Sequence, residues 1–181
     1  MPSPIAHTTV AYVLWHTFAS RPLPALGFSP RRVPVLLLAM AVLCMLPDLP
    51  SIYGLATGQL ARFHNSWEHS LSVGVLAALL GAAIALRHSR RSALRWFLIV
   101  LLCYESHVLM DSLTIGRGVM LFWPFSEQRL ASPIKIFYGL HWSDGWLSWK
   151  HLITLLTEAA FGGGVFWATQ RWRGNWPRFE A

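Results

Sequence analysis

The sequence predicts an all-α integral membrane protein, a polytopic bundle of about 4–5 transmembrane helices that forms one domain over residues 1–181. Of its 181 residues 54% are hydrophobic and only 13% are charged, whereas soluble domains carry about 25% charged residues. The mean hydropathy is +0.43. The apolar residues also gather in five segments, which are separated by short stretches that contain arginine or proline.

The first two segments are less regular than the others. Residues 5–20 are moderately apolar and are interrupted by His7 and His16, so this segment could span the bilayer or lie in its interface. Residues 33–46 are strongly apolar and stop at Pro47. Because a span needs about 20 residues, the second segment crosses only if its flanks complete it or the bilayer is thinned there.

The other three segments are stronger candidates for spans. Residues 70–86 are rich in leucine, alanine and glycine, and small residues allow helices to approach closely in lipid. Residues 93–111 follow after a short basic stretch. Residues 151–169 contain a glycine triplet, which membrane helices tolerate.

Residues 112–150 form the one long region that is not expected to span. Tryptophan and tyrosine favour the headgroup level of a membrane, so this aromatic-rich region is predicted to be a loop on the membrane surface. Its aromatic residues are Phe122, Trp123, Phe125, Phe137, Tyr138, Trp142, Trp146 and Trp149.

The basic residues predict an orientation. Cytoplasmic loops carry an excess of lysine and arginine, and one topology places 10 of the 15 on the inside, together with the C-terminus. Because the arginines form short clusters between apolar segments, no nucleic-acid partner is expected. The inner group is Arg21, Arg31, Arg32, Arg87, Arg90, Arg91, Arg95, Arg171, Arg173 and Arg178; the outer group is Arg62, Arg117, Arg129, Lys135 and Lys150.

Histidine and aspartate side chains lie where the apolar segments end, on the face opposite to the inner arginines. Ionisable groups near a bilayer are costly and indicate a functional site. Imidazole and carboxylate together suit a divalent metal, zinc first, with manganese or iron as alternatives. The candidate ligands are His7, Asp48, His64, His69, His107 and Asp111.

The spacing of these residues indicates a catalytic metal. His107 and Asp111 are four residues apart, so they project from one helical face and form half of a site. A metal with an open position makes hydroxide available near neutral pH. Glu68 is the favoured general base and Glu105 the alternative. Three arginines could hold an anionic group of the substrate: Arg62, Arg117 and Arg129.

Other interpretations of the same residues stay open at this stage. The pair of His107 and Asp111 could be a hydrogen-bonded packing contact, and Asp48 could cap a helix. The whole set could bind metal in a non-enzymatic or transporter-like protein, or form a buried network in a structural protein. His141 and Asp144 could belong to a second metal site.

At these residues the sequence resembles the YdjM-like family of inner-membrane metal-dependent hydrolases. The resemblance covers roughly residues 5 to 126, and its most specific element is the run from Ser106 to Thr114. It implies a protein of the bacterial inner membrane. In the multi-pass topology predicted from the basic residues, the metal site faces the periplasm or the outside. The other matching pieces are His7, Pro47-Asp48-Leu49, His64 to Ser70, Gly116, Gly118 and Trp123 to Ser126.

A more distant similarity connects the chain with the zinc-dependent phospholipase C and single-strand nuclease group. That group also uses an aspartate, a histidine and then a His-x-x-x-Asp pair, and Asp48, His64 or His69, His107 and Asp111 follow the same order. The similarity implies phosphoester hydrolysis. The expected partners are membrane lipid and a lipid or lipid-linked phosphate substrate.

Overall fold

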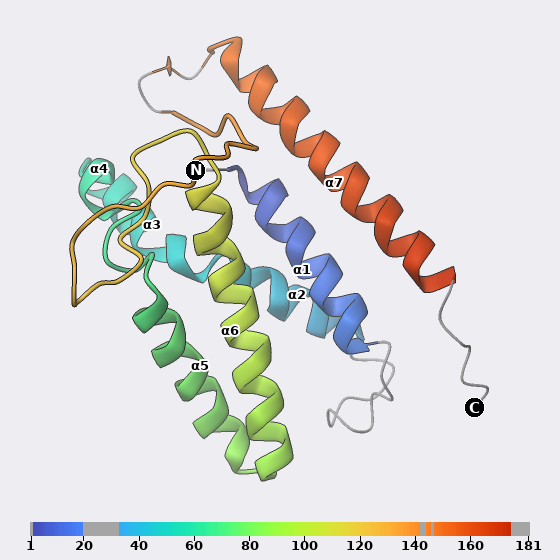
Figure 1. Ribbon diagram of the computed structural model, residues 1–181. Coiled ribbons are helices and arrows are strands. Elements are labelled where there is room, and N and C mark those ends of the chain that lie inside the picture. Colours follow the sequence, from blue (N-terminus) through green and yellow to red (C-terminus); the bar gives the residue numbers. More distant parts are fainter. Residues whose placement is uncertain (1, 20–32, 142–143, 146, 175–181) are drawn as a thin grey trace.

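The computed structural model describes residues 2–19, 33–141, 144–145 and 147–174, which form a helical bundle (Figure 1). This confirms the predicted fold class: the described residues contain no strand, only two isolated bridges in the region after α6. The elements are α1 (Pro4–Ala19), α2 (Val33–Cys44), the 3-10 helix η3 (Leu46–Asp48), α3 (Leu49–Ala56), α4 (Leu60–Phe63), α5 (Leu71–Leu86), α6 (Arg90–Ser112) and α7 (Lys150–Gly174).

Two of these helices are long and apolar enough to cross a membrane, α6 and residues Lys150–Trp172 of α7. A third candidate is the pair Val35–Cys44 and Leu46–Ala56, which is bent by 51° at the break between its halves. The helix α5 is apolar but shorter. The described helices therefore support two or three spans by length and composition, and the higher number expected from the sequence stays a prediction.

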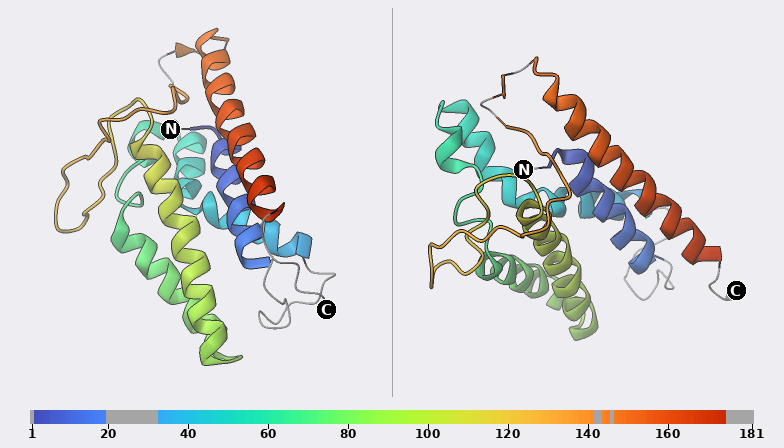
Figure 2. Two further views of the ribbon diagram at one scale, coloured as in Figure 1. Left: turned by 45° about the vertical axis from the view of Figure 1, so that its right-hand side comes forward. Right: turned by 45° about the horizontal axis from the view of Figure 1, so that its top comes forward.

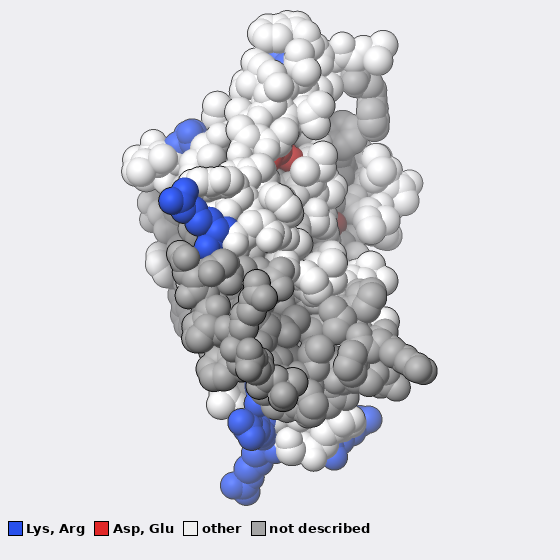
Figure 3. Space-filling model, turned by 90° about the vertical axis from the view of Figure 1, so that its right-hand side faces the viewer, with Lys and Arg blue, Asp and Glu red and all other residues white. Residues whose placement is uncertain are grey.

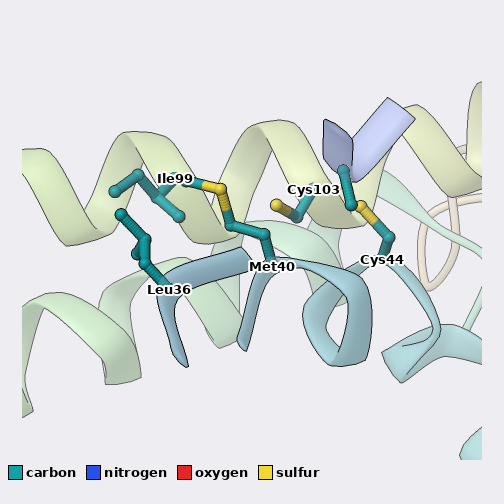
Figure 4. Close-up of a cluster of buried hydrophobic side chains, with 6 residues drawn as sticks. Leu36, Met40, Cys44, Ile99 and Cys103 are labelled. Atoms are coloured by element: carbon teal, nitrogen blue, oxygen red, sulfur yellow. The ribbon is translucent and has the colours of Figure 1, made fainter. Parts of the chain in front are cut away.

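The bundle is built around α6. Antiparallel α5 and α6 form a hairpin, while α1 packs against α2, α6 and α7 (Figures 1 and 2). Figure 4 shows side chains of α2 pointing toward α6 in a buried cluster. Cys44 and Cys103 are free and buried in this cluster. The cluster consists of Ala11, Leu36, Met40, Cys44, Ile99 and Cys103.

The short helices α3 and α4 lie in the stretch between the second and third apolar segments. The sequence predicts a loop for this stretch. Pro50 lies in the first turn of α3, where a proline needs no helical hydrogen bond and its fixed φ suits the helix. Prolines therefore lie both at the bend after α2, where Pro47 belongs to the 3-10 turn, and at the start of the new helix, where Pro50 lies.

The aromatic region after α6 is only partly a surface loop. Phe125 is 92% exposed and Trp149 is 72% exposed, as a membrane-surface loop requires. The prediction of a surface position is wrong for Phe137, which is buried against Ala6 and Met110 in the bundle. Residues 142, 143 and 146 of this region lie outside the described residues.

Basic side chains mark the lower end of the bundle. Figure 3 shows lysine and arginine atoms gathered at its lower end, at the level of the α5–α6 hairpin, where Arg87, Arg90 and Arg91 are exposed. A second basic group lies about halfway up the molecule in this view (Figure 3). Four arginines used for the topology prediction lie outside the described residues: Arg21, Arg31, Arg32 and Arg178.

Gly118 holds the turn after α6 in place, and we expect Gly118→Ala to destabilise the protein by about 1–3 kcal/mol. Its φ is +78°, and a Cβ there would lie 2.6 Å from the carbonyl oxygen of Leu130. The matched control is Gly116→Ala, because a Cβ at Gly116 meets no atom within 4 Å. Thermal unfolding in detergent checks both; equal midpoints for the two variants would contradict this view.

Candidate metal centre

The predicted ligands converge at the end of the bundle where α1 begins and α6 ends (Figure 1). His107 and Asp111 project from the last two turns of α6, and His7 lies near the start of α1. Asp48 ends the 3-10 turn that follows α2, and His69 immediately precedes Ser70, the N-cap of α5. Four parts of the sequence thus contribute to one cluster.

The centre of the cluster is the Nε2 atom of His69. It lies 3.2 Å from Nε2 of His107, 3.2 Å from Oδ2 of Asp111 and 3.5 Å from Oδ1 of Asp48. Nε2 of His107 is 3.6 Å from Oδ2 of Asp48 and 3.9 Å from Oδ2 of Asp111. Four side chains therefore direct nitrogen and oxygen lone pairs into one small volume.

Two further histidines flank this group. His7 places Nε2 3.7 Å from Oδ1 of Asp111, and its ring stacks on that of His107 with centroids 3.8 Å apart. On the other flank, Nδ1 of His64 lies 3.9 Å from Oδ1 of Asp48 and 3.2 Å from the hydroxyl of Ser51. Each of the six predicted ligands therefore has a nitrogen or oxygen atom within 4 Å of such an atom in another predicted ligand.

These side chains are buried, and several of them make no hydrogen bond. His7, His69, His107 and Asp111 are almost completely buried, and Asp48 nearly so. Within the described part of the chain, neither nitrogen of His7 and neither carboxylate oxygen of Asp48 or Asp111 makes a hydrogen bond. The carboxylates contact histidine rings of the same cluster, the shortest contact being 3.2 Å between Oδ2 of Asp111 and Nε2 of His69. Burial of several ionisable groups together is costly, and metal coordination is one of the few ways to compensate it. The donor set therefore fits a divalent cation.

Neighbouring groups orient two of the rings. Nδ1–H of His107 donates to the backbone carbonyl of Cys44 at 2.7 Å, which leaves Nε2 as the free lone pair. Nδ1 of His69 lies 3.4 Å from Oε1 of Glu68, so its Nε2 also faces the cluster. Metal-binding histidines are commonly held in this way by a carbonyl or a carboxylate.

Glu68, predicted as the general base, is itself held firmly. Its carboxylate accepts the backbone N–H of Ser66 at 2.7 Å, and the hydroxyl of Tyr104 donates to its carbonyl at 2.6 Å. This position suits a residue that orients His69. The role of Glu68 as a base stays a prediction.

The two loop histidines differ in their protonation. Burial lowers the pKa of His64 to about 4, so its imidazole is neutral at pH 7 and able to bind metal. Burial would also lower the pKa of His69, but the carboxylates of Asp111, Asp48 and Glu68 raise it well above the usual value. The carboxylates therefore attract positive charge to the centre of the cluster.

Arg117 and Arg129, predicted to bind substrate, hold the loop that carries His64. The guanidinium of Arg117 donates to the carbonyls of His64 and Asn65, and that of Arg129 donates to the carbonyl of Asn65 at 2.9 Å. Asn65 has a φ of 51°, so these contacts support a left-handed turn. Arg62 is exposed and lies over the ring of Phe63. Contact of these arginines with substrate stays a prediction.

Glu105, the alternative base, does not face the cluster. Successive helical residues are rotated by about 100°, so Glu105 projects from the face of α6 opposite to His107. It lines a separate cavity of about 610 Å³, together with Leu102 and Leu109. Within the described structure, none of the six candidate ligands lines this cavity.

His141 and Asp144 make other contacts. Asp144 pairs with Lys150 at 2.6 Å, and Nε2 of His141 lies 3.0 Å from the carbonyl oxygen of Tyr138. Among the described residues, neither belongs to a group of three potential metal ligands. The groups that do occur are His7 with His107 and Asp111, and Asp48 with His69 and His107.

Sequence reasoning did not identify the groups that orient the ligands. The acceptor for His107 is a backbone carbonyl, which has no residue-specific signal in the sequence. Tyr104, three residues before His107, could have been found from its helical position, because it faces the cluster side of α6.

Comparison with known proteins supports a membrane location. A family model described as "YdjM inner membrane protein" matches residues 1–176. The chain is also 31% identical over 140 residues to "Inner membrane protein YbcI" of Escherichia coli (strain K12), and the match covers 75% of each protein. No solved structure matches the chain.

Proposed function

The chain belongs to the YdjM family of inner membrane proteins, and we propose that its histidine–aspartate cluster is the divalent-metal centre of a hydrolase. The observation that carries the proposal is the burial of Asp48 and Asp111 beside four histidines with no hydrogen bond to either carboxylate in the described structure. A purely structural network would be expected to pair these oxygens.

Zinc is the favoured metal because the donors are nitrogen and oxygen atoms, with manganese or iron as alternatives. A bound divalent metal supplies an acidified water and a Lewis acid for ester cleavage. The chain contributes the remaining functions. Cys44 and Glu68 orient His107 and His69, and burial of the cluster limits the access of bulk water.

The surroundings of the cluster favour a lipid or lipid-linked phosphoester as substrate. Asp48 and His64 are its more accessible members, with side chains 9% and 15% exposed. Beside them α3 exposes Leu49, Ile52 and Tyr53, and Ser51 of the same helix contacts His64. Exposed apolar residues beside an opening are suited to contact with lipid. A substrate would then reach Asp48 and His64 from the membrane interface.

We further propose that the cluster faces the periplasm. The exposed arginines at the turn of the α5–α6 hairpin lie at the opposite end of the bundle from His69 and Asp111 (Figures 1 and 3). Because positively charged ends stay in the cytoplasm, the hairpin turn would be inside and the cluster outside.

A transport role is less well supported. Transport requires a path through the bundle, but Cys44, Cys103 and Met40 belong to an apolar cluster packed between α2 and α6, next to His107. Ligands at one end of a bundle with an apolar interior beside them favour chemistry at the surface.

The test is hydrolysis by purified, zinc-loaded protein of vesicles that contain phosphatidic acid and phosphatidylglycerol. Phosphorus NMR detects cleavage of any phosphoester bond. We expect conversion by the wild type, background conversion by Asp111→Asn, and unchanged conversion by the control Arg91→Gln on the distant hairpin turn. In right-side-out spheroplasts, lipid added outside should be consumed.

Absence of phosphoester cleavage by metal-loaded wild type would overturn the hydrolase proposal for these lipids. Cleavage that is equal in wild type and Asp111→Asn would overturn the assignment of the site.

A further inference from the structure

We infer that the centre holds two metal ions, each bound by two histidines and one aspartate. The first set is His7, His107 and Asp111, one of the two groups of close ligand atoms. The second consists of Asp48 and His69 from the other group, with His64 in place of His107, because His107 already serves the first ion and His64 lies 3.9 Å from Asp48. The inference rests on the proposed metal site and extends it to the number of ions and their ligands.

The number of donor atoms exceeds what one ion requires. Structural zinc takes four ligands, and catalytic zinc takes three from the protein and keeps one position open. The cluster offers four ring nitrogens and the four oxygens of Asp48 and Asp111. A single ion would leave several buried donors uncompensated, among them those of His7, which makes no hydrogen bond to the described residues.

The ligands divide between two parts of the fold. His7 on α1 is near Asp111, and its ring stacks on His107, so this set lies between α1 and α6. His64 is near Asp48, whose Oδ1 also lies 3.5 Å from Nε2 of His69. The second set therefore lies between the turn after α2 and the segment before α5.

Contacts between the two sets make them one centre. Nε2 of His69 is 3.2 Å from Oδ2 of Asp111, and Nε2 of His107 is 3.6 Å from Oδ2 of Asp48. A ring nitrogen has one lone pair and binds one ion, whereas the two oxygens of a carboxylate can bind different ions. Asp48 and Asp111 are therefore the residues able to bridge the pair.

A two-ion centre narrows the reaction class. Paired ions stabilise both the attacking and the leaving oxygen of a displacement at phosphorus, and phosphatases and nucleases use this arrangement. Two histidines and one aspartate per ion leave open positions for the phosphate oxygens of a substrate. The inference therefore favours a phosphoester over a carboxylic ester.

The test is the metal content of the detergent-purified full chain, reconstituted with zinc alone and dialysed. We expect about two equivalents in the wild type and about one in both His7→Ala and His64→Ala. The control His88→Ala removes an exposed histidine in the α5–α6 turn and should keep both. His64 lies at the more accessible edge, so its variant tests the inference even if His7→Ala does not fold.

A second measurement uses manganese in place of zinc. Two neighbouring manganese ions give an exchange-coupled EPR spectrum, which we expect in the wild type and expect to be lost in His64→Ala. One equivalent in the wild type, or an uncoupled spectrum at two equivalents, would overturn the two-ion centre and leave the proposed metal site standing. No metal in the wild type would overturn both.

Discussion

Replacement of His107 by alanine is expected to lower metal affinity by more than about a hundredfold, which exceeds the usual loss from a changed outer-shell partner. His107 belongs to both groups of potential ligands, and its ring also stacks on that of His7. The variant therefore removes the donor nitrogen of His107 and loosens the ring of His7, a second potential ligand. Elemental analysis after dialysis measures the effect, and phosphoester hydrolysis should fall to background with it.

Cys44→Ala is the matched control for this prediction. The contact from Cys44 to His107 uses its backbone carbonyl, which alanine retains, so this variant should keep its metal. Loss of metal in Cys44→Ala would indicate a thiolate ligand instead. Retention of the full wild-type metal content in His107→Ala would contradict the assignment of the centre.

Glu158→Ala is expected to destabilise the protein by about 3 kcal/mol, because two buried hydrogen bonds to one carboxylate are lost. Glu158 lies on α7 and is completely buried. It accepts the backbone N–H of Ser3 at 2.6 Å and also the hydroxyl of Ser3, so it binds the start of α1. Because Glu158 lies at the N-terminus of α1, its acidic group also interacts favourably with the dipole of that helix.

The same variant should weaken metal binding, because His7 follows Ser3 by one helical turn. We expect a lower thermal unfolding midpoint in detergent and a reduced metal content. The control is Glu127→Ala, which removes an exposed acidic residue outside the helices. Equal midpoints for Glu158→Ala and Glu127→Ala would show that the contact between α7 and α1 contributes little.

Much of the helix content followed from hydrophobicity. The five apolar segments correspond to α1, α2, α5, α6 and α7 within a few residues at each end, because long apolar runs in lipid must satisfy their backbone groups as helices. The spacing of His107 and Asp111 also placed them on one helical face without knowledge of any neighbour. The sequence alone therefore determined the fold class, the main helices and the residues worth examining.

Tertiary structure decided which side chains meet. In a membrane protein both the lipid and the bundle interior are apolar, so hydrophobicity does not reveal which face of a helix is buried. The sequence predicts Phe137 on the surface and carries no signal for the role of Glu158, yet both are buried in the bundle. The pairing of His7 with Asp111 and of His64 with Asp48 depends in the same way on contacts between distant segments. These contacts depend on how the helices pack against one another, and no local pattern in the chain encodes them.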